Sequence, residues 1–306
     1  MSEINRDNDR SYERISPTAW ISAYQRTLSN IPFSQEIFAE LQEIIKQTGS
    51  RAEIEDLEKL MKINEMTWVL EARFKIVNHL LKTHRINQII EVAAGVSPRG
   101  LEMVKDPSVE YVEVDLPGAI QEKKSIVEQL IVKSIVSKQP NLHLEEDNAL
   151  NLEDLLKATR FFKENSIAVV NEGFLPYLDL EGKSAFARNV HQLLERFGGI
   201  WITPDIPRKI PDTQGLSDEK LRFGRFKHMT EKLKHMTGVD ISKNRFENEE
   251  EAQAFFENLG FVVERHSFIE VIDELVSPHP EEVEKIARLM TVFLMETTPR
   301  NPKILV

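Results

Sequence analysis

Two neighbouring stretches of the sequence constrain the fold more than any others. Residues 88–99 read QIIEVAAGVSPR, an apolar strand that runs into a turn of small residues and then a short helix. Residues 111–117 read YVEVDLP, a second strand that stops on an acidic residue. This order of strand, tight turn, helix and acid-tipped strand is typical of an α/β sheet with a nucleotide-type site.

The turn after the first strand contains one glycine, Gly95, preceded by Ala93 and Ala94. A dinucleotide fold uses G-x-G-x-x-G to bring a pyrophosphate to a helix start, and only Gly95 of that trio is present. The turn is therefore poorly suited to a phosphate. A ligand that has a ribose but no phosphate fits better, and S-adenosylmethionine is the candidate. Asp115, at the tip of the second strand, is placed to accept the ribose hydroxyls.

From Ile89 onward, strands alternate with helices, which is the pattern of a parallel sheet covered on both faces. The expected strands are residues 88–93, 110–115, 141–145, 166–171, 199–203, 261–269 and 290–297. The expected helices lie near residues 98–105, 118–138, 151–163, 179–196, 248–258 and 280–289. The last two β-rich runs lack a complete βαβ rhythm, so we expect an antiparallel pair at the edge. We therefore predict a Rossmann-like α/β fold with a seven-stranded, mostly parallel sheet.

Two further regions extend this core. Before the first strand, Phe33–Gln47 and the segment from about Ile54 to Lys82 have apolar residues at helical spacing. Residues 204–247 are too long for a simple connection at their point in the sheet, so we interpret them as an inserted helical cap. The expected organisation is an N-terminal helical extension or lid over residues 1–85, followed by a core over residues 86–306 that the cap interrupts.

The composition limits the partners and the location of the protein. With 39 Lys and Arg against 50 Asp and Glu, the net charge is −11, which disfavours nucleic acid as a partner. The absence of cysteine excludes disulfides, thiol nucleophiles and cysteine-ligated zinc, and we expect no metal. No apolar run is long enough to span a bilayer, and the charged start lacks the apolar stretch of a signal peptide. We expect a cytoplasmic protein without a membrane partner.

Acidic and amide side chains occur at or near the ends of four predicted strands. Glu91 lies inside the first strand, where it either bonds backbone amides of the following loop or holds that loop and faces the cationic end of a ligand. Asp147 and Asn148 follow the third strand and suit an adenine ring, although Asp-Asn is also a common turn. Glu172 follows the fourth, where a carboxylate favours a sulfonium. Together with Asp115, these side chains are expected to surround one cleft.

Arg73 interrupts the apolar stripe of its predicted helix, four residues from both Val69 and Val77. An arginine at such a position either extends along the helix to solvent or meets an anion in the interior. From its place in the stripe alone, extension to solvent is the favoured prediction.

With these residues identified, the chain resembles the leucine carboxyl methyltransferase family of class I S-adenosylmethionine-dependent methyltransferases. Within that family it is similar to the bacterial branch of polyketide-type O-methyltransferases. The resemblance extends from Arg14 to about Trp201 and is weaker beyond. Its motifs are AR at residues 72–73, EVAAGVSPRG at 91–100, VEVDLP at 112–117 and NEGFLPYL at 171–178.

The resemblance assigns roles to individual positions. It implies that Arg73 pairs with the methionyl carboxylate, in contrast to the prediction from the helix stripe, and that Glu172 faces the amino group or the sulfonium. Ala93 stands where many methyltransferases have glycine. The remaining implied contacts are Gly95 to the methionyl part, Asp115 to the ribose, and Asp147 and Asn148 to the adenine. The complete expected cofactor set is Arg73, Glu91, Ala93, Gly95, Asp115, Leu116, Asp147, Asn148, Glu172 and Gly173.

The expected reaction is in-line transfer of the sulfonium methyl group to an oxygen of a small-molecule acceptor. A carboxylate acceptor needs no general base, whereas a hydroxyl acceptor benefits from one. The candidate acceptor-site residues are Phe174, Tyr177 and His228, and Tyr177, His228 and His235 are the candidate bases. The family varies beyond residue 204, so no acceptor contact carries over from the resemblance.

Three alternatives stay open at this point. A nicotinamide-dependent dehydrogenase would share the sheet, but the missing glycines count against it. A methyltransferase that acts on a protein C-terminus would need an open acceptor cleft rather than a closed cap. A non-catalytic nucleotide-binding or scaffold protein is disfavoured, because Arg73, Gly95, Asp115 and Glu172 are all present.

Overall fold

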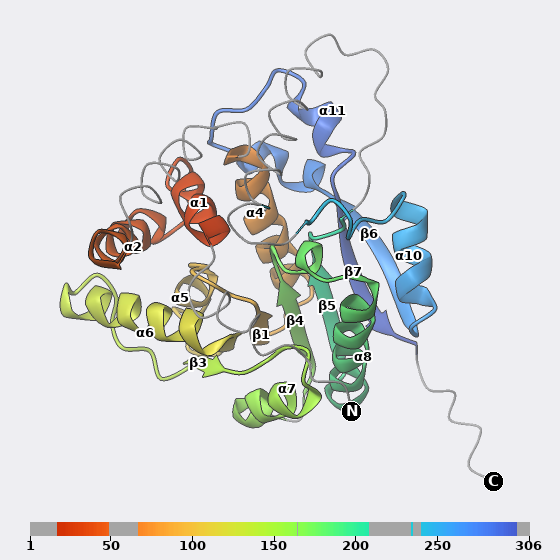
Figure 1. Ribbon diagram of the computed structural model, residues 1–306, viewed down its shortest axis with the longest axis horizontal. Helices are drawn as coiled ribbons and strands as arrows, with labels where there is room; N and C mark the ends of the chain where they lie inside the picture. The colour runs from red at the N-terminus through yellow and green to blue at the C-terminus, as the bar shows by residue number, and fades with distance from the viewer. Residues whose placement is uncertain (1–16, 49–66, 164, 208–233, 235–239, 299–306) are drawn as a thin grey trace.

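The computed structural model describes residues 17–48, 67–163, 165–207, 234 and 240–298. At its centre is a seven-stranded sheet in the order β3-β2-β1-β4-β5-β7-β6 (Figure 1). The strands are β1 (Gln88–Val92), β2 (Glu110–Asp115), β3 (Leu142–Glu146), β4 (Ile167–Asn171), β5 (Gly199–Thr203), β6 (Phe261–Ser267) and β7 (Thr291–Thr297). Strands β1 to β5 pair in parallel, and β7 pairs antiparallel with both β5 and β6. The predicted seven-stranded, mostly parallel sheet and its antiparallel C-terminal pair are confirmed.

Helices connect and cover the strands near the predicted positions. They are α1 (Pro17–Arg26), α2 (Ser34–Thr48), α4 (Thr67–Thr83), α5 (Arg99–Met103), α6 (Pro117–Val132), α7 (Leu152–Ala158), α8 (Leu180–Phe197), α10 (Glu249–Glu257) and α11 (Val283–Ala287), with the short 3-10 helices η3 (Thr159–Phe161), η4 (Leu175–Tyr177) and η5 (Phe268–Glu274). Asn151, Asp179 and Asn248 cap α7, α8 and α10 by accepting a backbone N–H of the first turn. Helix α6 ends at Val132, before the predicted residue 138, because Ser134 has a left-handed φ of +57°.

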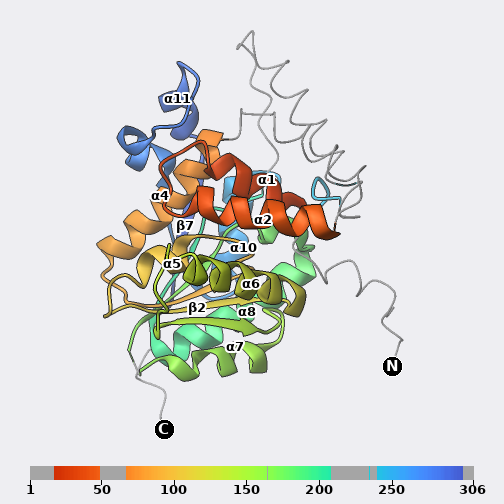
Figure 2. The same ribbon diagram turned by 90° about the vertical axis from the view of Figure 1, so that its left-hand side faces the viewer.

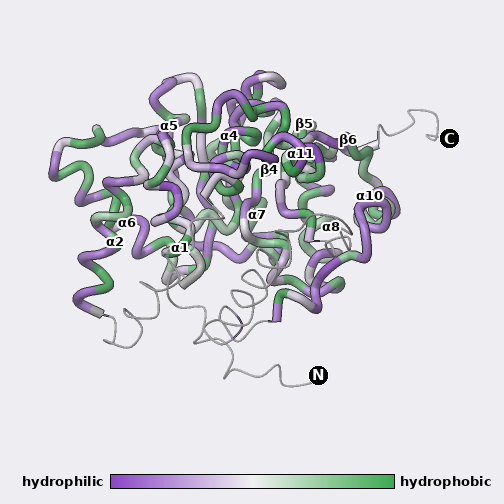
Figure 3. The backbone as a smooth tube through the Cα atoms, turned by 90° about the horizontal axis from the view of Figure 1, so that it is seen from above, coloured by the Kyte–Doolittle hydropathy of each residue, from purple (hydrophilic) through white to green (hydrophobic). Residues whose placement is uncertain are grey.

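The two faces of the sheet bury different sets of side chains. On β2, Val112 and Val114 contribute to a core shared with α7, α8 and α10, whereas Tyr111 contributes to the core on the α4 side. The alternation predicted for the apolar residues of this strand is therefore confirmed. Figure 2 shows the layers edge-on, with α6 on one side of the sheet and α7 and α8 on the other. Hydrophilic stretches run along α10 and parts of α2 and α6 (Figure 3).

The N-terminal helices lie over one end of this core. Helices α1 and α2 pack against each other, α1 also contacts α4, and α2 contacts α6 (Figure 2). Ala23, Ile37 and Leu41 pack there with Val96, which belongs to the turn after β1, and with Ile126 of α6. The predicted helix at residues 33–47 is confirmed as α2. Of the helix predicted from Ile54 to Lys82, residues 67–82 are helical and the preceding part lies outside the described residues.

Most of the predicted cap also lies outside the described residues. The structure describes residues 204–207, 234 and 240–247 of it. Lys183, from α8, donates hydrogen bonds to the carbonyl oxygens of Leu178 and Asn244, with 2.8 Å to Asn244, so the end of this segment is fixed on α8. Among the helices that the structure describes, none has the length and apolar character needed to cross a bilayer.

Gly199 begins β5 with a φ of +108°, in the left-handed half of conformational space. A side chain at this position would overlap the carbonyl oxygen of Ile167 on β4, and its Cβ would lie 2.7 Å from the Ile167 backbone nitrogen. We expect Gly199→Ala to lower the free energy of unfolding by about 3 kcal/mol, because backbone strain and steric overlap add at a fixed strand pair. Urea denaturation measures the difference from the wild-type protein.

Gly173→Ala is the matched control for this substitution. Gly173 has a φ of +80°, but no heavy atom lies within 4 Å of the position that a Cβ would take. Backbone strain alone predicts a loss of about 1 kcal/mol there. Equal losses for the two variants would contradict the steric explanation at Gly199.

Candidate functional site

The turn after β1 is held in a strained conformation at the carboxyl edge of the sheet. Ala93 and Gly95 both have positive φ angles, +53° and +49°. Glycine adopts this conformation freely, whereas alanine does so at a cost, so the turn is strained at Ala93. Ala19 of α1 lies over the turn, since a Cβ added to Gly95 would be 3.7 Å from the Ala19 Cβ. The turn is therefore both tightly bent and covered by α1.

Asp115 at the tip of β2 ties this turn to the second strand. Its Oδ2 accepts the backbone N–H of Gly95 at 2.8 Å, and its Oδ1 accepts the backbone N–H of Leu116 at 2.8 Å. Burial raises the pKa of Asp115 above its usual value, and these two hydrogen bonds partly offset that effect. Each carboxylate oxygen keeps a second lone pair for a ligand hydroxyl. The structure thus brings together the turn and the predicted ribose residue.

Glu91 is the centre of a buried side-chain network beneath the turn. It accepts hydrogen bonds from Ser97 Oγ at 3.1 Å and from Tyr111 Oη at 2.9 Å, and it forms an ion pair with Arg99. The interpretation that Glu91 bonds backbone amides of the loop is wrong, because its partners are side chains. It nevertheless holds the loop, through Ser97 and Arg99. Arg99 is completely buried and lies over the ring of Phe74, 4.7 Å from its centroid.

Glu172, directly after β4, is surrounded by three guanidinium groups. Its Oε1 lies 3.0 Å from Arg26 Nη2 and 3.8 Å from Arg73 Nε, and its Oε2 lies 2.9 Å from Arg99 Nη2. Burial opposes ionisation of this carboxyl group, but the three arginines outweigh burial and lower the pKa of Glu172 to about 2. Glu172 is therefore a carboxylate at every physiological pH.

Arg73 points into the protein rather than to solvent. Its side chain is 17% exposed and forms an ion pair through Nη2 with the fully buried carboxylate of Asp205. The prediction from the helix stripe, extension to solvent, is therefore wrong, because an interior anion is available to Arg73. Asp205 was assigned only to the start of the predicted cap. Its position two residues after the tip of β5 was the signal that could have identified it.

Arg26 is a second residue that the sequence did not reveal. It ends α1, and its ion pair with Glu172 joins residues 146 positions apart, so no local pattern marks it. Among the described residues, the Nε atoms of Arg26 and Arg73 are buried without a hydrogen-bond partner. Two donors beside the Glu172 carboxylate therefore remain available.

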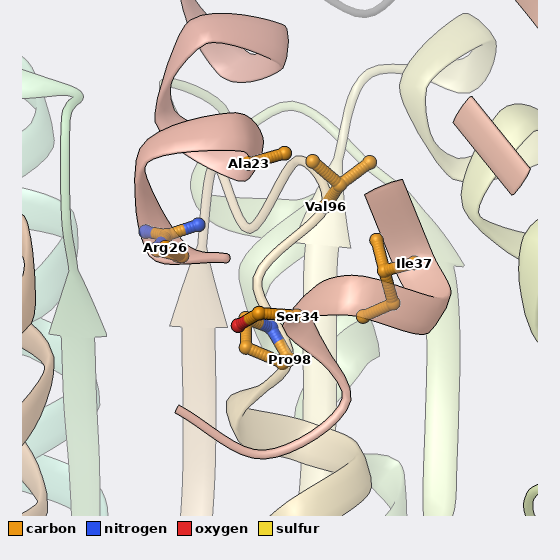
Figure 4. Close-up of a pocket in the computed structure, with 6 residues that line it drawn as sticks. All are labelled: Ala23, Arg26, Ser34, Ile37, Val96 and Pro98. Atoms are coloured by element: carbon orange, nitrogen blue, oxygen red, sulfur yellow. The ribbon is translucent and has the colours of Figure 1, made fainter. Parts of the chain in front are cut away.

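A small hollow adjoins Arg26 between the N-terminal helices and the turn after β1. It is too narrow to hold a water molecule. Figure 4 shows Ala23 close to Val96 on one side of it and Ser34 close to Pro98 on the other, with Arg26 and Ile37 at its flanks. Ser34 Oγ is buried and has no partner within the described part of the chain. The hollow is thus apolar except at Arg26 and Ser34.

Of the two predicted site residues after β3, Asp147 is buried and Asn148 is exposed. Asp147 is buried, and its backbone N–H donates to the carbonyl oxygen of Asp115 at 3.1 Å, which places it beside the tip of β2. Its Oδ1 lies 3.0 Å from Lys157 Nζ, whereas Oδ2 has no partner among the described residues. Asn148 is exposed, and its Oδ1 accepts the backbone N–H of Leu150 at 2.9 Å. The turn alternative thus describes what Asn148 does in this structure.

The predicted acceptor-site residues follow Glu172. Gly173 has a positive φ of +80° and redirects the chain. The backbone N–H of Phe174 donates to Asp205 at 2.7 Å, and its ring meets Phe186 edge-on with 5.1 Å between centroids. Tyr177 ends the short helix η4. His228 and His235 lie outside the described residues.

Comparisons with known proteins identify a family. A family model described as leucine carboxyl methyltransferase matches residues 25–191. No curated protein matches the chain. Among solved structures, a possible exported protein from Bordetella parapertussis is 13% identical with a TM-score of 0.49, over 96% of this chain and 99% of that one. The methyltransferase SibL in its apo form is 11% identical with a TM-score of 0.49, over 87% of this chain and 69% of that one.

The family match covers more than half of the chain. The matched residues contain the strand tips described above, from the Gly95 turn through Asp115 to Glu172, together with Arg73. The chain therefore belongs to the leucine carboxyl methyltransferase family, and it is an S-adenosylmethionine-dependent methyltransferase.

Proposed function

We propose that this methyltransferase transfers a methyl group to a carboxylate or hydroxyl oxygen of a small-molecule acceptor. The observation that carries the proposal is the covered site at the carboxyl edge of the sheet, where buried arginine N–H groups that have no hydrogen-bond partner among the described residues adjoin Glu172. Helix α1 lies over the Gly95 turn, and a covered site suits a small acceptor better than a protein chain end. We also propose that residues 1–85 serve as a lid on the core formed by residues 86–306, with residues 204–247 as its cap.

The side chains of the site fit the groups of S-adenosylmethionine. Asp115 would accept the ribose hydroxyls, and the free Nε–H of Arg73 would bind the methionyl carboxylate. Asp147 Oδ2, which has no partner among the described residues, would accept from the adenine amino group. Glu172 would then lie near the methionyl ammonium or the sulfonium. The residues present therefore match a ligand whose amino-acid end carries a carboxylate and an ammonium group.

Charge balance supports the same assignment. The buried cluster, here called the arginine cluster, contains three cations and three anions, which sum to zero: Arg26, Arg73, Arg99, Glu91, Glu172 and Asp205. The carboxylate and ammonium of the cofactor's amino-acid end cancel, so that end would add no net charge to this cluster, and the sulfonium would add one positive charge that Glu172 can face.

The bound cofactor supplies the electrophilic methyl group, and the chain supplies position and a dry environment. Helix α1 and the turn after β1 exclude water from one side, while the ion pairs of the arginine cluster fix the strand-tip loops. A carboxylate acceptor would need no general base. For a hydroxyl acceptor, Tyr177, His228 and His235 are the candidates, and we assign the role to none of them.

The test combines binding with identification of the product. Calorimetry should detect binding of S-adenosylhomocysteine, and no binding would overturn the proposed function. Incubation with a cell extract and a methyl-labelled cofactor should then place the label in a small molecule, which mass spectrometry would identify. Label confined to proteins would favour the alternative, methylation of a protein C-terminus.

Asp115→Ala should weaken binding of S-adenosylhomocysteine by about 1–3 kcal/mol. The substitution removes the acceptor for the ribose hydroxyls and leaves the N–H groups of Gly95 and Leu116 without their partner. Calorimetry measures the change. Asp106→Ala is the control, because Asp106 is exposed and its carboxylate accepts hydrogen bonds from Ser108, and its loss should leave affinity unchanged. Unchanged affinity in Asp115→Ala would remove Asp115 from the site.

A further inference from the structure

Asp205 is a buried acid that joins three parts of the site. Its side chain is fully buried just beyond the tip of β5. Oδ2 accepts the backbone N–H of Phe174 at 2.7 Å and Nδ2 of Asn171 at 3.2 Å, whereas Oδ1 faces Arg73. Thus one oxygen is engaged by the end of β4 and the loop after it, and the other by an arginine from helix α4.

The position of Asp205 does not depend on Arg73. Asn171 is itself fixed, because its Oδ1 accepts from Trp201 Nε1 at 2.7 Å and its Nδ2 donates to Thr203 Oγ1 at 3.0 Å. The backbone N–H of Asp205 also donates to Thr203 Oγ1, at 3.2 Å. Strands β4 and β5 therefore hold the carboxylate in place, and Asp205 is a rigid anchor for any group that contacts Oδ1.

Arg73 is held at one end and free at another. Its Nη2 is engaged by Asp205, while Nε is buried, lies 3.8 Å from Glu172 Oε1 and has no hydrogen-bond partner among the described residues. A guanidinium group is planar, so fixing Nη2 restricts the direction of the Nε–H bond. A buried ion pair contributes little net stability when its desolvation is counted, so stability alone is a weak reason for this arrangement.

We propose that Asp205 is a positioning residue that acts through Arg73, orienting the guanidinium so that its free edge binds the carboxylate of the cofactor's methionyl tail. The inference rests on the proposed function, because it requires the cofactor tail to lie at Arg73. It adds a role for Asp205, which holds Arg73 through Nη2 and leaves the Nε–H for the ligand.

The Asn variant separates this role from a merely structural one. Both oxygens of Asp205 face donors, and asparagine offers one acceptor and one donor. The Phe174 backbone N–H belongs to a fixed loop, so the asparagine oxygen should stay there and its NH₂ group should face Arg73. Two donors in contact would turn the guanidinium away from its position.

The experiment compares two ligands by calorimetry. S-adenosylhomocysteine carries the amino-acid tail, and 5′-methylthioadenosine lacks it. In Asp205→Asn, affinity for S-adenosylhomocysteine should fall about tenfold or more, the size of a lost hydrogen bond to a charged group, whereas affinity for 5′-methylthioadenosine should change by less than about twofold. Equal weakening of both ligands, or no weakening of either, would overturn the proposal.

Two further variants test whether the effect passes through Arg73. In an Arg73→Gln background, adding Asp205→Asn should lower the affinity for S-adenosylhomocysteine by less than a further factor of about two, because the group that Asp205 positions is gone. Gly199→Ala destabilises the start of β5 without touching Asp205, so it should lower the melting temperature and keep the ratio of the two affinities. Additive losses in the double variant, or a changed ratio in Gly199→Ala, would contradict the inference.

Asp205→Glu keeps the proposal testable if the Asn variant is insoluble. It retains the charge and moves the carboxylate by one methylene, so it too should weaken binding of S-adenosylhomocysteine and spare binding of 5′-methylthioadenosine. Full affinity for S-adenosylhomocysteine would contradict the inference.

The proposed function and this inference fail in different ways. A wild-type protein that does not bind S-adenosylhomocysteine overturns the proposed function and this inference together. Binding that neither Asp205 variant changes overturns the inference alone.

Discussion

Glu172→Gln should lower the free energy of unfolding by about 3–5 kcal/mol, because it leaves buried arginines without their counter-ion. Glu172 contacts Arg26 at 3.0 Å and Arg99 at 2.9 Å, and its side chain is only 4% exposed. Within the described residues Arg26 pairs with no acid besides Glu172, so the substitution places an uncompensated charge at the end of α1. Urea denaturation at neutral pH measures the loss.

Glu146→Gln is the matched control for this prediction. Glu146 pairs with Lys124 at 2.9 Å, but its side chain is 35% exposed. Surface ion pairs contribute about 0–1 kcal/mol, so this variant should unfold close to the wild-type protein. Similar losses in the two variants would show that the surroundings of Glu172 are not as dry as the structure indicates.

The same carboxylate predicts a dependence of stability on pH. The pKa of Glu172 is lowered from 4.5 to about 2, so the folded protein holds its proton less tightly than the unfolded chain does. The resulting stabilisation, about 3 kcal/mol, is fully present above pH 4.5 and is lost as the pH falls towards 2. The difference in stability between the wild-type protein and Glu172→Gln should therefore shrink over this range.

A second buried acid does not disturb this comparison. Burial raises the pKa of Glu113 to about 7 in spite of Lys123, so Glu113 changes stability at higher pH and with the opposite sign. It is present in both proteins and therefore cancels in the difference. A difference that stays constant from pH 5 to 2 would contradict the assignment of the lowered pKa to Glu172.

The alternation of strands and helices was predictable because each element carries its own period of apolar residues. Asp115 and Glu172 were predictable for a related reason, since the ends of parallel strands meet at one edge whatever the details of packing. The ion pairs of the arginine cluster were not predictable from the sequence. Arg26 and Asp205 contact partners 146 and 132 positions away, and such contacts depend on how helices α1 and α4 cross the sheet edge. A lone arginine or aspartate carries no local signal of that geometry.

Arg73 shows why the orientation of a charged side chain on a helix could not be predicted from the sequence pattern alone. Its place in an apolar stripe predicts a choice between solvent and an interior anion, and helical spacing cannot decide between them. The orientation of Arg73 depends on its ion pair with Asp205, which follows strand β5. The resemblance to a family identified the inward orientation because a motif records the result of packing. It did not identify Asp205, which lies beyond the residues that the family model matches.

Arg99→Met should be as destabilising as the loss of Glu172, by about 3–5 kcal/mol, because it removes the cation shared by two buried carboxylates. Arg99 pairs with Glu91 and Glu172 and donates from Nε to Asn78 at 2.9 Å. It therefore connects the β1 strand, the β4 tip and helix α4. Methionine fills a similar volume, so the loss measures charge and hydrogen bonding rather than a cavity.

Arg265→Met gives the comparison for a surface arginine. Arg265 pairs with Glu249 at 3.5 Å and Glu250 at 3.3 Å, and its side chain is 35% exposed, so about 1 kcal/mol or less should be lost.

The double variant Glu91→Gln with Arg99→Met should recover part of the stability lost in Arg99→Met, since it removes one of the two carboxylates left unpaired. If the losses are instead additive, Arg99 and Glu91 are not energetically coupled, and their ion pair does not help to hold the turn that carries Gly95.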